Sequence, residues 1–281
     1  MLRMRKCARS PPTLTKKLRS HRSLSALQLE LQGSLRIMAS WRGTPSSEHL
    51  DPTSKWLHHV DEHILPEVGV EMLKLALFPF IGKTKYQVAQ ELRTPSQVYY
   101  FLLEKHFKHN KQQALQWFVH ALSCLQSPRS RGKYLLGRGC QNQYDISLPA
   151  PPTDVDTELK FYECITKICD KAYGTDQHLV EKLKEQFSKK GILNANPEGL
   201  YHLPQIFIRL IQKEVVGPNK VNRLIKTFEK YEGNTTARWC LFYLNNYLRS
   251  AGMPQIPSMQ GVTRGQLIES RHHKYVIPVP N

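Results

Sequence analysis

The sequence predicts an all-α protein in which two bundles of about six short helices follow one another. A disordered N-terminal segment is expected before them and an irregular C-terminal tail after them. Apolar residues recur at helical spacing from residue 56 to 125 and again from 159 to 248, whereas the alternation typical of strands is almost absent. A stretch rich in Gly and Pro separates the two helical regions, as expected of a domain boundary. The chain of 281 residues is long enough for two domains of ordinary size.

Residues 1–54 form the first region, which the composition predicts to be basic and mostly disordered. The chain carries 40 Lys and Arg against 23 Asp and Glu, a net charge of +17, and residues 1–38 hold nine basic residues and one acid, or +8. This composition, with leucines at helical spacing, is typical of a mitochondrial transit peptide. The alternatives are a basic arm that contacts nucleic acid or anionic lipid, and an upstream extension without a structural role that ends before Met38. Whether residues 1–37 belong to the mature protein stays open.

The first helical bundle is expected over residues 55–136. Pro66 and Gly82 are expected to end its first two helices, Ser96 to cap the fourth and Asn110 to begin the fifth. The predicted helices cover residues 56–65, 70–80, 86–92, 96–105, 110–122 and 134–136.

Residues 137–155 are expected to be a flexible Pro- and Gly-rich linker, and residues 156–250 a second helical bundle. Asp156 or Thr157 is expected to cap the first helix of this bundle. The tail, residues 251–281, contains four prolines and is expected to be irregular. The predicted helices of the second bundle cover residues 157–168, 176–187, 200–211, 221–228 and 239–248.

The distribution of charge disfavours nucleic acid as the partner of the helical regions. Residues 56–126 carry seven bases and six acids, or +1, and residues 156–250 carry fifteen bases and eleven acids, or +4. No apolar run is long enough for a transmembrane helix. The six cysteines are scattered without a CxxC pair and are expected to be ordinary buried thiols. We therefore expect a cytoplasmic protein, with a mitochondrial or nuclear location as the alternative.

Catalytic and metal-binding chemistry has only weak signals in the sequence. His59 and His63 are four residues apart, so a helix would place them on one face, as zinc ligands can be. No nearby acid or cysteine completes a clear tetrahedral set of zinc ligands in the sequence, and a solvated His-rich face is the favoured interpretation. The sequence has no Walker A or G-x-G-x-x-G loop and no family-specific context around a nucleophile. We expect no enzyme, no cofactor, no metal and no small-molecule substrate.

The two helical regions share a pattern of residues that resembles a known family. Each has a Leu-Lys pair in its second helix, at residues 73–74 and 183–184, followed by an isoleucine, Ile81 or Ile192. The clearest stretch is residues 203–210, Leu-Pro-Gln-Ile-Phe-Ile-Arg-Leu. The pattern resembles the death effector domains of the death-fold superfamily, arranged in tandem as in the regulatory halves of initiator caspases and FLICE-like inhibitory proteins. The resemblance implies two six-helix death-fold-like bundles.

The sequence departs from this family at one motif. Death effector domains often carry Arg-x-Asp-Leu near the last helix, paired with an acid on the first helix. Here residues 223–226 read Arg-Leu-Ile-Lys and lack the aspartate, and so do residues 131–134. Acids do occur on the expected first helices, as Asp61, Glu62 and Glu163. A caspase-recruitment domain is an alternative for the first region.

The resemblance implies a non-enzymatic adaptor or regulator that binds death-fold partners in apoptosis or innate immune signalling, with self-association possible. The alternative is a mitochondrial or nucleic-acid-associated helical protein directed by the basic N-terminus, and a helical-repeat scaffold ranks last. Basic residues beside the apolar positions of the second bundle form either a solvated face or a docking surface for an acidic partner. The candidate partner-binding residues are Glu163, Lys182, Lys184, Lys189, Lys190, Lys220, Arg223 and Lys226.

Overall fold

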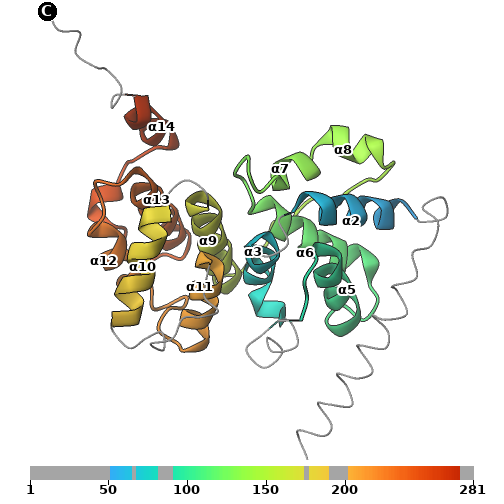
Figure 1. Cartoon of the computed structure of the whole chain (residues 1–281), viewed down its shortest axis with the longest axis horizontal. Coiled ribbons are helices and arrows are strands. Elements are labelled where there is room, and N and C mark those ends of the chain that lie inside the picture. The colour runs from blue at the N-terminus through green and yellow to red at the C-terminus, as the bar shows by residue number, and fades with distance from the viewer. Residues whose placement is uncertain (1–50, 65–67, 82–90, 174–176, 190–201, 273–281) are drawn as a thin grey trace, which may run out of the picture. The chain divides into compact units, whose positions relative to one another are not determined.

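The computed structural model describes residues 51–64, 68–81, 91–173, 177–189 and 202–272, which form helices, turns and loops without a strand (Figure 1). The all-α prediction is confirmed for this part of the chain. Residues 1–49 and 50–281 are separate units. The predicted disordered segment, residues 1–54, lies almost wholly outside the described residues. The finer prediction of two six-helix bundles stays a prediction.

Three of the N-terminal helices begin at polar caps that the sequence supplies. Asp51 accepts hydrogen bonds from the backbone N–H groups of Thr53 and Ser54 at 2.9 and 3.2 Å. Asn110 caps its helix as predicted, whereas Thr94 rather than Ser96 caps the preceding one, through a capping box with Gln97. The predicted helix at 86–92 lies mostly outside the described residues. The helices are α2 (Pro52–His63), α3 (Val68–Ala76), α5 (Pro95–Lys105), α6 (Lys111–Ser123), α7 (Gly132–Leu135) and α8 (Arg138–Gln143).

Trp56 is the centre of packing among these helices. Its side chain is fully buried, its indole ring meets that of Phe118 edge-on at 6.1 Å, and its Nε1–H donates to the backbone oxygen of Leu135 at 3.2 Å. The chain approaches α6 closely at the start of α7, where a Cβ on Gly132 would lie 2.4 Å from the backbone oxygen of Leu122. Trp56 therefore holds α2 against both α6 and α7.

The C-terminal helices are arranged around α9 and α13, which pack against each other. Asp156 caps α9 by accepting from the backbone N–H of Leu159 at 2.7 Å, as predicted, and Asn234 caps α13. Ten side chains of α9 are buried, whereas Lys160, Glu163, Lys167 and Lys171 form one half-buried polar stripe along it. The elements are α9 (Thr157–Ala172), α10 (Gln177–Lys189), α11 (Leu203–Gln212), α12 (Asn222–Glu229), α13 (Thr235–Ser250), η2 (Pro257–Met259) and α14 (Arg264–His272).

The two groups of helices are in contact, because α3 packs against α9 and α11 as well as against α5 (Figure 1). All the residues of α3 except Glu71 are buried. Asp170 of α9 extends the contact: its carboxylate accepts hydrogen bonds from the backbone N–H groups of Gln126 and Ser127 and from the Ser127 hydroxyl, at 2.7 to 2.9 Å. Residues 50–281 are accordingly one compact unit.

Two segments differ from their predicted conformation. Residues 137–155 were expected to be a flexible linker, but α8 occupies 138–143, and the Gln116 side chain donates to the backbone oxygen of Ala150 at 3.3 Å. The tail was expected to be irregular from residue 251, but it contains η2 and α14. Asn245 of α13 fixes this tail, because its side chain accepts from the backbone N–H of Ile256 at 2.8 Å and donates to the backbone oxygen of Met259 at 3.2 Å. The tail also buries apolar side chains, and this burial offsets the conformational entropy that the tail loses when it is ordered.

None of the described helices combines the length and the apolar character needed to cross a membrane.

Candidate functional site

Helices α10 and α12 carry most of the basic residues that the sequence singled out. The two helices are joined where Gln186 of α10 donates to the Thr227 hydroxyl of α12 at 3.0 Å. Lys182 precedes Gln186 by one helical turn, and Arg223 precedes Thr227 by one helical turn. Each helix therefore carries a basic side chain on the same side as the residue that joins it to the other helix. We call Lys182, Lys184, Lys220, Arg223 and Lys226 the basic set; Lys182 and Lys184 are two residues apart and lie on opposite sides of α10.

Ion pairs and a hydrogen bond within the protein divide the basic set into two groups. Lys184 lies 2.9 Å from Glu181, Lys182 lies 3.6 Å from Glu185, and the ammonium group of Lys220 donates to the backbone oxygen of Glu214 at 3.2 Å. Exposed ion pairs of this kind contribute only about 0–1 kcal/mol, so a partner can displace them. Arg223 and Lys226 are exposed and form no ion pair within the described part of the chain. These two charges are therefore the ones most available to a partner.

Glu163 does not belong to the basic set. It lies on α9, pairs with Lys167 on the same helix, and its charge acts on His120 of α6 and on Cys124, which directly follows α6. Its role as a partner-binding residue stays a prediction. The side chain of Lys189 and all of Lys190 lie outside the described residues.

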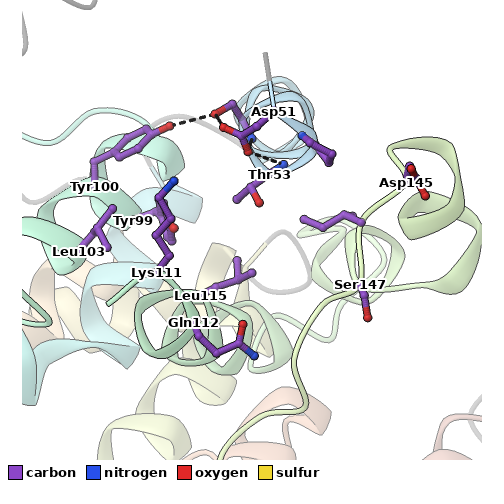
Figure 2. A pocket seen from close by; sticks show the side chains of 13 residues that line it. Asp51, Thr53, Tyr99, Tyr100, Leu103, Lys111, Gln112, Leu115, Asp145 and Ser147 are labelled. Carbon is purple, nitrogen blue, oxygen red and sulfur yellow. Dashed lines mark hydrogen bonds between the residues drawn. The ribbon is translucent and has the colours of Figure 1, made fainter. Parts of the chain in front are cut away.

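A second feature is a pocket of about 330 Å³ between the start of α2, helices α5 and α6, and residues 145–147 (Figure 2). Burial opposes ionisation of Asp51, but hydrogen bonds from Ser54 and Thr53 and the charge of Lys111 outweigh it, so the pKa of Asp51 lies below its usual value. Burial also raises the pKa of Tyr99 to about 12, so its hydroxyl stays protonated. The Asp51 carboxylate caps α2 and also accepts a hydrogen bond from the Ser54 hydroxyl at 2.8 Å, and both residues line this pocket. The pocket offers space for a small polar group.

The described cysteines are buried thiols, as the sequence predicted. Five free thiols are buried, at Cys124, Cys140, Cys164, Cys169 and Cys240. Burial raises the pKa of the Cys124 and Cys164 thiols far above the usual value. A thiol in that state is neither a nucleophile nor a metal ligand at neutral pH.

Sequence reasoning missed two groups that the fold brings into structural or chemical roles. Asp170 is 3% exposed and binds the loop after α6, and no local signal marked it, because the N–H groups that it accepts from lie more than 40 residues away in the sequence. Glu62 lies beside His59 and His63. Its position in the sequence could have revealed this, because it comes three residues after His59 and directly before His63. The favoured solvated-face interpretation is also wrong for His59, which is 7% exposed.

Comparison with protein-family models, with curated proteins and with solved structures finds no match. In its described residues the protein is all-α, and α12 carries two exposed basic side chains, Arg223 and Lys226.

Proposed function

We propose that this protein is a non-enzymatic adaptor or regulator that binds the death-fold domains of other signalling proteins in apoptosis or innate immune signalling. The observation that supports the proposal is the exposed pair Arg223 and Lys226 on α12, whose charges no acid of the described residues neutralises. The residue pattern shared by the two helical regions supports the choice of partner class. The partner surface is expected to be acidic, because opposite charges steer association and suppress wrong partners.

The close packing of the described unit supports binding by occupancy rather than by a chemical step. Helices α3 and α9 share a buried contact, and Asp170 joins α9 to the loop after α6. A surface carried by such a body loses little conformational entropy on binding, so more of the contact energy becomes affinity. Occupying a partner's surface is enough to recruit that partner or to exclude a competitor.

Binding by purified full-length protein to a panel of death effector domains and caspase-recruitment domains tests this function. We expect saturable binding to at least one domain, with an affinity that weakens as salt rises from about 50 to 200 mM because the contact is electrostatic. An unlabelled single-stranded RNA serves as the competitor that represents the rival function. Failure to bind any domain of the panel, or binding to RNA with the steep salt dependence of phosphate contacts, would contradict the proposal.

A further inference from the structure

The last turn of α2 brings three potential metal ligands together. His59, Glu62 and His63 each offer one ligand atom, and these atoms lie within 4.8 Å of one another. The positions i, i+3 and i+4 place all three side chains on one face of the helix. The two imidazole rings have centroids 3.9 Å apart and planes inclined by 50°, so the ring planes converge on one side instead of stacking flat.

The hydrogen bonding of His63 determines which of its nitrogens is available. Its Nδ1 lies 2.9 Å from the backbone oxygen of His59. A carbonyl oxygen only accepts hydrogen bonds, so Nδ1 must carry the proton and Nε2 keeps the lone pair. Ligating histidines commonly donate their other N–H to a backbone carbonyl in this way, which fixes the tautomer and the ring orientation. His63 is therefore already held as a ligand would be.

His59 is a buried histidine whose polar atoms the protein does not satisfy. Its side chain is 8% exposed, and its ring lies 4.9 Å from the ring of Tyr144 and 6.2 Å from that of Tyr134. Its Nε2 is buried without a hydrogen-bond partner, and its Nδ1 is 3.8 Å from Glu62, which is too long for a hydrogen bond.

We propose that His59, Glu62 and His63 form a binding site for Zn²⁺, with solvent completing the coordination. Two imidazoles and one carboxylate suit zinc, whereas Mg²⁺ and Ca²⁺ prefer oxygen ligands alone. Zinc–ligand distances of about 2.0–2.1 Å require ligand atoms about 3.4 Å apart. The ligand atoms therefore have to move closer together, and the Glu62 side chain, which is 57% exposed, can change rotamer to approach the imidazoles. The site goes beyond the proposed adaptor function and does not depend on it.

Zinc bound here would fix the end of α2 against its neighbours. The ring of His63 lies 6.0 Å from that of Tyr134 in α7, and Tyr144 directly follows α8. Locking both imidazoles would therefore also restrain the contact between α2 and the segment from α7 to α8. Any ligand that binds only the folded state raises the midpoint of thermal unfolding.

Calorimetric titration of the chelator-treated full chain with zinc chloride tests the site, and the visible spectrum of Co²⁺ reports the coordination geometry. We expect about one equivalent of zinc bound and a tetrahedral Co²⁺ spectrum. We also expect an affinity about tenfold lower or worse in His63→Ala and at least about threefold lower in Glu62→Gln. Glu62→Gln keeps the size of an exposed side chain, so it carries the test even if His63→Ala is destabilised.

Two histidines provide matched controls. His178 is exposed on α10, and His58 lies on α2 beside the other carboxylate oxygen of Glu62, at 3.5 Å, but outside the ligand set. His178→Ala and His58→Ala are each expected to bind zinc within about twofold of the wild-type affinity. Absence of stoichiometric zinc binding would overturn the proposal. So would undiminished zinc affinity in both His63→Ala and Glu62→Gln.

Discussion

The ring of Phe78, just after α3, lies against the ring of Tyr162 in α9, with centroids 5.2 Å apart and planes inclined by 29°. Both side chains are buried, at 2% and 4% exposed. This stacked pair joins the N-terminal helices to the C-terminal helices at the contact between α3 and α9. The described unit is therefore expected to unfold as one cooperative body.

Replacing Phe78 by Ala is expected to destabilise both groups of helices together. Removing a buried phenylalanine costs about 3–5 kcal/mol in the free energy of unfolding, which chemical denaturation followed by circular dichroism measures. Ile268→Ala is the matched control, because Ile268 is an exposed apolar residue on α14, and its loss is expected to stay within about 0.5 kcal/mol. A Phe78→Ala protein as stable as this control would show that the contact does not couple the two groups.

Asp170 is expected to be a second determinant of that coupling. In Asp170→Ala, the backbone N–H groups of Gln126 and Ser127 lose their acceptor inside the protein, at a cost of about 3 kcal/mol. Asp170→Asn keeps one acceptor oxygen and is expected to lose less. Asp154→Ala, at an exposed aspartate, is the control for removing one negative charge. Equal stabilities of Asp170→Ala and Asp154→Ala would refute this role.

His120 is expected to make the protein less stable in mild acid. Burial lowers its pKa below 6.5, against the opposing charge of Glu163, and Lys167 lowers it further. The unfolded chain therefore takes up a proton near pH 6.5 that the folded protein takes up only at lower pH, so the free energy of unfolding falls as the pH decreases from 7 to 5.

His120→Phe removes this titration and is expected to show a smaller loss of stability between pH 7 and pH 5 in thermal melts. Asp61, whose pKa is raised by burial, has the opposite effect on stability but is present in both proteins and cancels in the comparison. His178→Ala, at an exposed histidine, is expected to keep the wild-type dependence on pH. A pH dependence unchanged by His120→Phe would show that another group is responsible.

Asn245 is expected to hold the tail in place. Asn245→Ala removes the acceptor of the Ile256 N–H and the donor to Met259, so amide hydrogen exchange from residue 256 to 268 is expected to accelerate by about tenfold or more. Asn246→Ala, at the adjacent half-buried asparagine, is the control and is expected to leave exchange in the tail unchanged. The same protection in both variants would mean that apolar burial alone docks the tail.

Local signals predicted much of the helical fold, because a polar cap before an apolar helical stripe is readable within one segment. Asn110 and Asp156 are such caps. Helix α8 was missed because Cys140 is its only buried residue, so it has no apolar stripe to read. The docked tail was missed because its order depends on Asn245 and on burial against α13, which no local pattern encodes.

The candidate sites were likewise predictable only where their residues follow a local pattern in the sequence. The lysines of α10 and α12 could be found by composition, but the bond between Gln186 and Thr227 that joins the two helices could not. Spacing alone placed His59 and His63 on one face. The burial of His59 depends on Tyr144, which is distant in the sequence, and spacing says nothing of it.

The most direct test of the proposed function is a charge reversal on α12. In a titration of full-length protein with a death-fold domain that binds it, Arg223→Glu combined with Lys226→Glu is expected to weaken the affinity by about tenfold or more. Lys133→Glu combined with Arg138→Glu makes the same change in net charge at two exposed residues of α7 and α8, and is expected to stay within about twofold of the wild type. Equal affinities of the two double variants would contradict the account.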